Sequence, residues 1–379
     1  MKTDMSPEAV TARLKKTSEL RKLCISLGGD RLEKKLRNNV MKNVMKIRGK
    51  YNSATVYTDN IDSASLNQLY SMLNIPCFAD TRIAVMPDVH LGRGSVVGFT
   101  MTCNDFINPH IIGVDIGCGV VAYNLGQQDI DPAAFDAFVH AAIPAGGNVH
   151  RDISKKLVKK NKALDALIQK VAPAEHKRIL LSIGTLGGGN HFLELDRDQE
   201  GNIWLIIHSG SRNLGLQVCR YHQNAARRSI KESFQGAGAF HGMEYMPLKN
   251  GGEEYLHDMR IAQAYAEENR NAMAAIIIEG FFKKQPAHCE RITSIHNYVN
   301  FDDMIIRKGA ISAHKDELVI IPLNMRDGCL LAKGKGNEDW NCSAPHGAGR
   351  LLKRSDTKEL ISLEDYQQSM QGIYSSCIR

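Results

Sequence analysis

Short apolar runs alternate with longer amphipathic stretches along most of the chain, and the apolar runs end in polar residues or glycine. Apolar runs of four or five residues are typical of buried strands, and they occur at residues 54–57, 82–86, 204–207, 292–295 and 318–321. Apolar residues at helical spacing predict helices at residues 10–23, 30–47, 64–73 and 255–282, and at 130–168 with a break near 144–147. The pattern predicts one domain of mixed α and β structure over residues 46–379.

A basic stretch, residues 1–45, precedes that domain, with many lysines and arginines interspersed among apolar positions. A helical arm of this kind either contacts nucleic-acid phosphate or is a solvated helical extension. Interspersed charge favours the solvated extension. The lysine-rich residues 155–170 are expected to be exposed.

The composition is that of an ordinary globular chain, with 43% hydrophobic and 23% charged residues. A net charge of +7, from 48 Lys and Arg against 41 Asp and Glu, permits a polyanionic partner without requiring one. The nine cysteines show no C-x-x-C spacing, and the sequence shows neither a secretory signal nor an apolar run of membrane-spanning length. We therefore expect reduced cysteines, a cytoplasmic location, no membrane partner and, by default, a monomer.

Residues 113–119 read Gly-Val-Asp-Ile-Gly-Cys-Gly and stand out from this ordinary background. Three glycines in seven residues permit positive φ angles and close backbone approach, so Asp115 and Cys118 can point at one spot. A hard carboxylate oxygen and a soft sulfur directed together suggest a metal site. The other interpretation is a tight strand-to-loop turn with a buried free cysteine.

Three histidines, at positions 191, 208 and 296, add possible metal ligands at the ends of predicted strands, each beside Asn, Ser or Gly. A lone histidine after a strand is more often a core or surface residue, but three in this setting favour a site. With Asp115 and Cys118 they make five candidate ligands, one more than closes a structural zinc site. Five ligands suit two metals that share a bridging thiolate, an arrangement used for displacement at phosphorus. From the ligand types alone, Zn²⁺ is the expected metal.

Two glycine-rich loops suggest phosphate chemistry nearby. Residues 183–189 contain four glycines, which bring backbone N–H groups close to a phosphate-like ligand, although the Gly-Lys-Ser/Thr ending of a P-loop is missing. His346 precedes the second loop, Gly347-Ala348-Gly349, which offers room and N–H donors. A phosphate-bearing substrate therefore fits the same region as the candidate metals.

Several charged residues near these loops have two open interpretations. Arg212, Arg350 and Arg354 can pair bidentately with phosphate, or each can form a surface ion pair. Asp88 and His90 follow a predicted strand, where they can serve acid–base chemistry or contact an RNA end. The alternative for that pair is an Asx-type turn with a surface histidine.

Together these motifs resemble the RtcB-type RNA-splicing ligases. The resemblance covers residues 46–355 or so, with the motifs in family order. The matching runs are MPDVHLGRG at 86–94, GVDIGCG at 113–119, GGGNHFLE at 187–194, HSGSR at 208–212, His296-Asn297, and HGAGR at 346–350. Any one of these runs is weak, but the set is highly specific.

The resemblance implies an α+β fold, a single large mixed-sheet domain with a central metal-binding cleft. It also implies a ligase that uses GTP and two Mn²⁺ to join an RNA 2′,3′-cyclic phosphate or 3′-phosphate end to a 5′-hydroxyl end, in tRNA splicing or RNA repair. Cys118 would bridge the two Mn²⁺, with Asp115 and His191 completing one site. His208 and His296 would complete the other.

For the nucleotide and the RNA, the resemblance implies further roles. His346 would attack the α-phosphorus of GTP and carry GMP, and Asp88 would lie near the incoming 5′-hydroxyl. Arg212, Arg350 and Arg354 would contact RNA phosphate. The residues implied to contact GTP are Asn190, His191, Phe192, Leu193, Glu194, His296, Asn297, Pro322, Leu323, Asn324, Met325, Cys329, His346, Gly347, Ala348 and Gly349.

The chain departs from the family pattern in the nucleotide region. Leu323-Asn324 replaces a family Gly-Ser, Cys329 stands where a serine is expected, and family chains run on past residues 372–374 with a Tyr and a Lys that enclose guanine. An active ligase acting on RNA with broken ends, with an accessory activating protein as a possible partner, is the leading hypothesis. The alternatives are a catalytically impaired metal- and RNA-binding homologue, or a cyclic phosphodiesterase that does not ligate.

Overall fold

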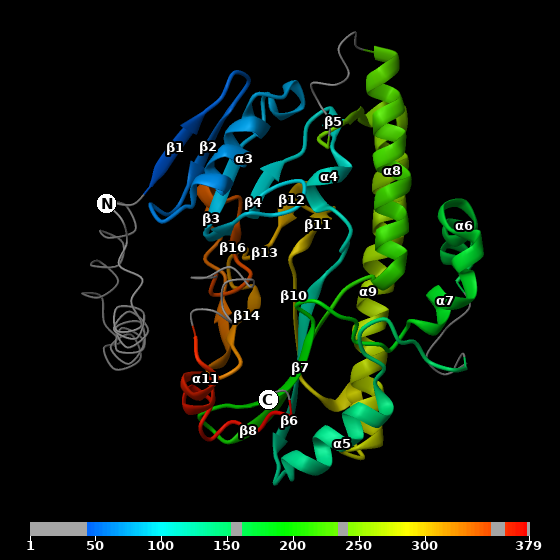
Figure 1. Cartoon of the computed structure of the whole chain (residues 1–379), viewed down its shortest axis with the longest axis vertical. Helices are drawn as coiled ribbons and strands as arrows, with labels where there is room; N and C mark the ends of the chain where they lie inside the picture. Colours follow the sequence, from blue (N-terminus) through cyan, green and yellow to red (C-terminus); the bar gives the residue numbers. More distant parts are fainter. Residues whose placement is uncertain (1–43, 153–160, 234–241, 350–360, 377–379) are drawn as a thin grey trace.

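The computed structural model describes residues 44–152, 161–233, 242–349 and 361–376 (Figure 1). The expected helix at 10–23, most of that at 30–47, and the two arginines at 350 and 354 lie outside the described residues. The helix predicted at 30–47 is wrong for residues 45–47, because Met45–Arg48 is a strand that pairs with Ser53–Val56. Strand pairing there overrides the local helical spacing.

The first sheet is mixed, with six strands in the order β1-β2-β3-β4-β12-β11. β2 and β3 are parallel, whereas the other neighbouring pairs are antiparallel. The runs predicted as strands at 54–57 and 82–86 fall in β2 and β3. The bounds are β1 Met45–Arg48, β2 Ser53–Val56, β3 Ile83–His90, β4 Val97–Thr102, β12 Ile305–Lys308 and β11 Asn297–Asn300.

The second sheet has four antiparallel strands in the order β10-β6-β8-β7. Three two-stranded ribbons complete the β structure, β5-β9, β13-β16 and β14-β15. The sheet strands are β10 Arg291–Ile295, β6 Gly119–Gln127, β8 Asn202–Ser209 and β7 Phe192–Arg197. The ribbon strands are β5 Phe106–Ile107, β9 Met246–Pro247, β13 Ala310–Ser312, β16 Ser343–Pro345, β14 Leu318–Asn324 and β15 Gly328–Lys333.

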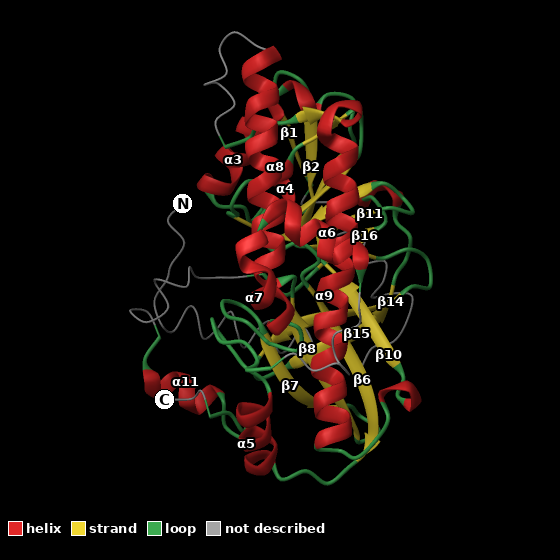
Figure 2. Cartoon of the chain, turned by 90° about the vertical axis from the view of Figure 1, so that its right-hand side faces the viewer, coloured by secondary structure: helices red, strands yellow, loops and turns green. Residues whose placement is uncertain are grey.

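Long helices cover one side of both sheets, and in Figure 2 α8 and α9 lie in front of the strands. The helices are α3 Ser63–Leu73, α4 Pro109–Ile112, α5 Pro132–Ala142, α6 Lys162–Val171, α7 His176–Leu181, α8 Arg212–Ser233, α9 Glu253–Gly280 and α11 Leu363–Ser369. Side-chain N-caps begin several of them; for example, Asp62 accepts hydrogen bonds from the first amides of α3. Among the described residues, no helix combines the length and apolar character needed to cross a membrane.

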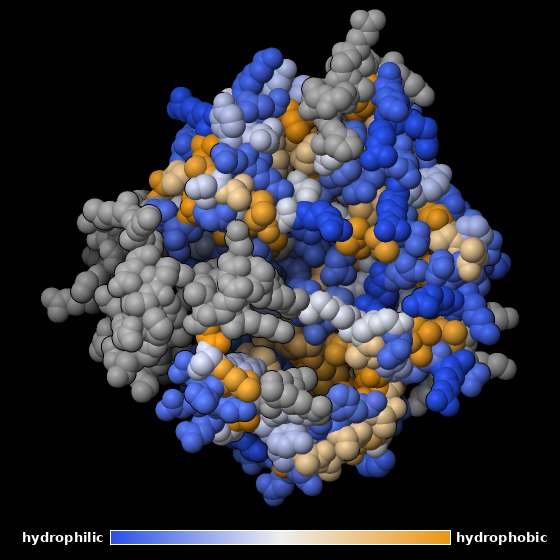
Figure 3. Space-filling view, viewed as in Figure 1, coloured by the Kyte–Doolittle hydropathy of each residue, from blue (hydrophilic) through white to orange (hydrophobic). Residues whose placement is uncertain are grey.

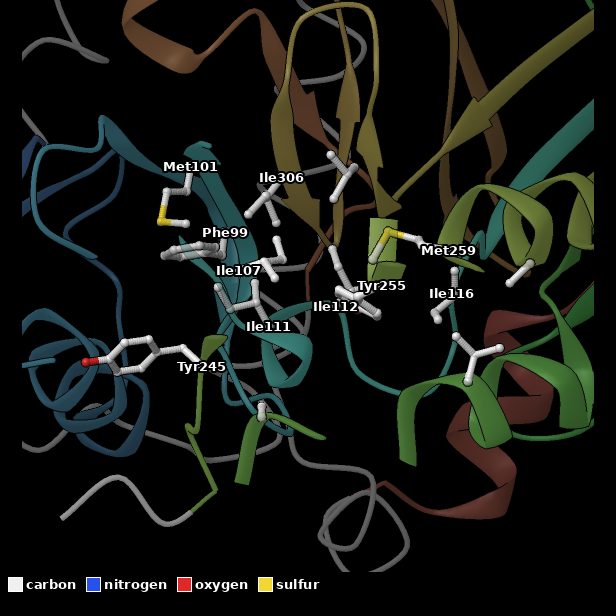
Figure 4. Close-up of a cluster of buried hydrophobic side chains, with 14 of the residues drawn as sticks. Phe99, Met101, Ile107, Ile111, Ile112, Ile116, Tyr245, Tyr255, Met259 and Ile306 are labelled. Carbon is white, nitrogen blue, oxygen red and sulfur yellow. The ribbon is translucent and has the colours of Figure 1, made fainter. Parts of the chain in front are cut away.

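Helix α9 joins the two parts of the core. Its first half, including Tyr255, Met259 and Tyr265, packs in the larger cluster under the six-stranded sheet. Its second half, including Met273 and Ile277, packs against the four-stranded sheet. Figure 4 shows part of the larger cluster, where α9 side chains lie near those of α4 and β4. One helix therefore holds both sheets in a fixed relation.

The segment predicted as helical at 130–168 is shorter in the structure. Helix α5 ends at Ala142, residues 143–152 are not helical, and α6 begins at Lys162. The lysine-rich part is also only partly exposed, because α6 buries Leu164 and Leu167. Helix α8 was not among the predicted helices. The fold otherwise agrees with the expected α+β domain.

The chain crosses from one sheet to the other at His296. This residue stands between the end of β10 and the start of β11. Its backbone N–H donates to the carbonyl of Cys118, and the N–H of Gly117 donates to that of Asn297. The glycine-rich stretch 113–119 is thus tied to the junction between the sheets, and this junction positions the candidate metal ligands.

Candidate metal centre and active site

The structure brings the five predicted ligands together at the sheet junction. They form two groups whose ligand atoms lie within 4.8 Å of one another. One group is Cys118, His208 and His296, all buried, and the other is Asp115, Cys118 and His191. Cys118 is the residue common to both groups. Such a set of donors could hold two adjacent cations that share one sulfur.

The distances show how closely the donor atoms converge. Sγ of Cys118 lies 3.2 Å from Nε2 of His208 and 3.6 Å from Nε2 of His191. Nε2 of His208 lies 3.2 Å from Nε2 of His296. Nε2 of His191 lies 3.2 Å from Oδ2 of Asp115. Each histidine directs Nε2 toward the cluster, so all three can donate the same ring nitrogen to a metal.

Backbone carbonyls fix the proton on the far side of two of these rings. Nδ1 of His208 donates to the carbonyl of Asn190, and Nδ1 of His191 donates to the carbonyl of Leu186, both at 3.0 Å. A carbonyl only accepts, so Nδ1 carries the hydrogen and Nε2 keeps its lone pair for a metal. Burial also lowers the pKa of His208 to about 3, which keeps the ring neutral at pH 7.

The anionic ligands respond to burial in different ways. Burial favours the neutral form of Asp115, but the contact with His191 outweighs it and lowers the pKa of Asp115 to about 2. Burial raises the pKa of Cys118 well above its ordinary value. A bound divalent cation would reverse that effect, since coordination deprotonates a thiol. The mixed oxygen, nitrogen and sulfur donors therefore fit a divalent first-row transition metal.

Two glycines are required here by close approach. A Cβ on Gly210 would overlap the carboxylate of Asp115, and one on Gly187 would overlap the guanidinium of Arg212. Gly187 also has a φ of 90°. Gly187 and Gly210 thus make room for charged side chains beside the centre.

Arg270 lies beneath the centre, and the sequence interpretation did not include it. It is fully buried, and its Nη1 donates to the carbonyls of Gly117 at 2.7 Å and Ser209 at 2.8 Å. These carbonyls are adjacent in sequence to Cys118 and His208. Within the described residues its Nε and Nη2 have no hydrogen-bond partner. Arg270 therefore ties together the two segments that carry these ligands.

His346 lies beside the cluster and is held by a carboxylate. Its Nδ1 lies 2.7 Å from Oδ2 of Asp88, and its ring centroid lies 4.9 Å from that of His296. Asp88 is 6% exposed and stands inside β3, so the interpretation of this motif as an Asx-type turn is wrong. With Nδ1 engaged by Asp88, Nε2 is the ring nitrogen that can act as a nucleophile.

A third group of possible ligands lies on β7 and β15. Glu194, Asp196 and Cys329 place their donor atoms within 4.8 Å of one another. Sγ of Cys329 donates to Oε1 of Glu194 at 3.5 Å, and the N–H of Cys329 donates to Oδ2 of Asp196 at 3.0 Å. Sequence interpretation missed Asp196, although strand alternation places it on the same face as Glu194.

Other residues expected near a nucleotide have varied surroundings. The side chain of Asn324 caps the β14–β15 turn through the amides of Arg326 and Asp327. Oδ1 of Asn297 accepts from the amide of Gly309. The ring of Phe192 lies edge-on to that of His208. The structure therefore brings Phe192 to the centre, whereas both side-chain groups of Asn324 are engaged in its turn.

Arg212 begins helix α8 next to the centre. Its Nε donates to Oγ1 of Thr185 at 3.2 Å and its Nη2 to the carbonyl of Gly146 at 3.0 Å. These contacts hold the guanidinium beside the glycine-rich loop rather than in a surface ion pair. An anion at the centre would lie near a fixed positive charge.

A family model described as tRNA-splicing ligase RtcB matches residues 68–172 and 139–378, a range that includes every residue of this centre. The chain belongs to the RtcB family. The resemblance inferred from the motifs is confirmed. Family membership also accounts for the joint appearance of the metal ligands, His346 and the two glycine-rich loops.

Curated RtcB relatives match over most of their length. RNA-splicing ligase RtcB of Escherichia coli strain K12 is 31% identical over 336 residues, covering 80% of this chain and 82% of that protein. tRNA-splicing ligase RtcB of Methanococcus maripaludis is 26% identical over 417 residues, covering 87% and 85%. tRNA-splicing ligase RtcB of Aeropyrum pernix is 25% identical over 411 residues, covering 85% of this chain and 85% of that protein.

Proposed function

We propose that this chain is an RNA ligase that joins 2′,3′-cyclic phosphate or 3′-phosphate ends to 5′-hydroxyl ends, using GTP and two Mn²⁺, through GMP carried on His346. The observation that carries the proposal is the position of His346, oriented by Asp88 at 2.7 Å and adjacent to a donor set for two metals. The names of the relatives support RNA ligation as the reaction class.

The proposed reaction has three chemical steps. Water opens a cyclic phosphate to a 3′-phosphate where the end is cyclic. Nε2 of His346 displaces pyrophosphate from GTP and then passes GMP to the RNA 3′-phosphate. The 5′-hydroxyl then attacks the phosphorus of the RNA 3′-phosphate, and GMP leaves as the new phosphodiester forms. When bound, the metals would polarise the phosphoryl oxygens and stabilise their developing charge.

The chain's own residues have defined parts in these steps. Asp88 would accept the hydrogen bond of Nδ1–H of His346, which fixes the ring orientation and the neutral tautomer in which Nε2 carries the lone pair. Arg212 supplies a fixed positive charge for RNA phosphate. Asp115, Cys118 and the three histidines would hold the metals, and Glu194 would accept hydrogen bonds from guanine.

Incubation with α-labelled GTP and Mn²⁺, followed by denaturing separation, tests the proposal. An acid-labile, alkali-stable protein–GMP bond is the expected result. A chain that binds metal and RNA but takes no label would instead be an impaired binding homologue. Opening of cyclic phosphate ends without joining would identify a phosphodiesterase.

The substitution Arg270→Met is expected to weaken Mn²⁺ binding by about 10- to 100-fold, the usual cost of losing a group that orients metal ligands. The reason is that Nη1 of Arg270 holds the carbonyls beside Cys118 and His208. Titration calorimetry with Mn²⁺ measures the effect. Arg307→Met is the matched control: Arg307 is also fully buried but pairs with Asp303, so its loss should reduce stability and leave metal affinity unchanged. Equal Mn²⁺ affinity in Arg270→Met and wild type would contradict the assignment.

Nucleotide affinity is expected to rise about fivefold from pH 7 to pH 8 and by less than a further factor of about two above pH 8. Burial and the charge of Asp196 raise the pKa of Glu194 to about 8, so at pH 7 most of the carboxyl is protonated. The ionised form offers two acceptor oxygens and a charge to the N–H groups of guanine, whereas the protonated form keeps one acceptor oxygen, and ionisation increases as the pH passes through the pKa. Equilibrium binding of GTP without metal, across this range, measures the rise.

Two variants separate Glu194 from titration of the nucleotide phosphates. Glu194→Gln retains the phosphate titration but should lose the additional rise. Asp196→Asn removes a charge that raises the pKa of Glu194, so the rise should move to lower pH. A wild-type profile that matches Glu194→Gln would show that this carboxyl does not contact the base.

A further inference from the structure

One face of helix α8 carries a row of exposed cations. Arg220, Arg227, Arg228 and Lys231 are all exposed, and at about 100° per residue their positions fall within an arc of about 100°, which places them on one side of the helix. We call these four residues the α8 basic face. The opposite side packs into the core through the buried residues Leu214, Val218, Cys219, His222, Ala226 and Ile230.

The charge on this helix has a single sign over most of its length. Residues 212–231 contain no aspartate or glutamate, and the first acidic residue is Glu232. Helix α9, packed beside it, mixes both signs. Over the whole chain the charges nearly balance, with 48 basic and 41 acidic residues. The α8 basic face is therefore a local concentration of positive charge.

Among the side chains that the structure describes, most of these cations lack an acidic partner that would neutralise them. Arg227 lies 3.4 Å from the buried carboxylate of Glu244. Arg220, Arg228 and Lys231 form no ion pair with any side chain that the structure describes. Three long cationic side chains are thus available to an external anion, whereas solvated helix faces usually carry compensating acids.

The helix that carries the α8 basic face begins beside the candidate active site. The helix begins at Arg212, whose guanidinium contacts Thr185 and Gly146 beside the metal ligands. Its 22 residues extend ~33 Å at 1.5 Å per residue. In Figure 1 the helix runs away from the sheet junction toward the top of the molecule, and in Figure 3 hydrophilic side chains gather over it on the face that contains the central hollow.

We propose that the α8 basic face binds the sugar–phosphate backbone of substrate RNA beyond the end held at the centre. This inference rests on the proposed function. Phosphates repeat along a strand, and a row of arginine and lysine side chains neutralises several of them without reading sequence. RNA long enough to pass from Arg212 along the helix gains these contacts, whereas an oligonucleotide of a few residues occupies only the centre.

The test compares a triple variant with a matched control. The variant is Arg220→Gln, Arg228→Gln and Lys231→Gln, and the control is Lys46→Gln, Arg48→Gln and Lys50→Gln, three exposed cations on β1 and its turn. In Figure 1, β1 lies on the opposite side of the molecule from α8. The RNAs carry a 3′-phosphate and are either about four or about thirty nucleotides long. Binding constants are measured over a series of salt concentrations.

For the long RNA, the α8 variant should lose about two to three units from the slope of log K against log salt, at about 0.7 to 0.9 per phosphate contact. Binding and joining of the short RNA should not change. The β1 control should match wild type for both RNAs. An unchanged slope with long RNA would overturn the proposal, and so would an equal loss for both RNAs; an unchanged slope is also the result expected if an acidic protein occupies this face.

Labelling with GTP separates failure of this inference from failure of the proposed function. A chain that forms the GMP adduct but shows no change of slope in the triple variant would overturn only the role of α8. A chain that takes no label but loses slope in the variant would support RNA binding by α8 and contradict ligation.

Discussion

The variant His346→Ala should take no detectable GMP label, a loss on the order of 10³-fold or more, while it still binds two metal ions. Nε2 of His346 is the proposed nucleophile, and its substitution leaves none of the metal-ligand contacts disturbed. His346 lies beside His296 but is not a member of either donor group. Labelling with α-labelled GTP and metal analysis of the same sample measure both outcomes.

Asp88→Asn is the companion variant for this prediction. An amide keeps the size of the side chain but lacks the charge that holds Nδ1–H of His346. Labelling should slow without being abolished, because the nucleophile is still present. Persistent label on His346→Ala would show that another residue carries GMP.

The second large effect is expected for Cys118→Ala, which should lose both metal ions and, with them, the GMP adduct. Cys118 is the one residue shared by the two donor groups, so its loss removes a ligand from each. The imidazoles and Asp115 alone leave each group with two donors. Metal content after dialysis, followed by labelling, measures the result.

Cys219→Ala is the matched control, since Cys219 is equally buried but lies outside both donor groups. Both substitutions remove a buried sulfur, so a general packing defect would affect both variants alike. Retention of one metal by Cys118→Ala would argue against a bridging sulfur and in favour of separate sites.

The convergence of the candidate metal ligands could be predicted because each lies in a short motif beside glycine or at the end of an apolar run. His208 follows the strand run at 204–207, and His296 follows that at 292–295. Strand ends bring polar side chains out of the core, and glycine beside them signals close approach. These features are local, so the sequence alone contains them.

Other parts of the fold could not be predicted from the sequence pattern, because they depend on packing between segments that are distant in the chain. Residues 45–47 became a strand because β2 offers a pairing partner. Helix α8 has a weak apolar stripe, because its buried face includes His222, which bonds to Asp258, and Gly215, which packs closely against Ser211. A hydrophobic pattern cannot show a helix face that is buried through polar pairs.

The contacts that hold the residues of the centre in place could not be predicted either, because they join segments that are distant in the sequence. The bond between Asp88 and His346 joins residues 258 positions apart, and it exists only after β3 and β16 are assembled. Arg270 did carry a signal, since it falls among buried positions at helical spacing from Ala266 and Ala274. A charged residue on an apolar stripe indicates a buried polar partner, but the sequence does not say which one.

The position of His296 between β10 and β11 also has a consequence for biosynthesis. Chains are made from the N-terminus, and His296 is the last of the five ligands to be synthesised, long after Cys118. Until β10 and β11 have left the ribosome, the thiol of Cys118 lacks His296 as a neighbour. Completion of the five-residue donor set is therefore a late event in the life of the nascent chain, and Cys118 must stay reduced until then to serve as a thiolate ligand.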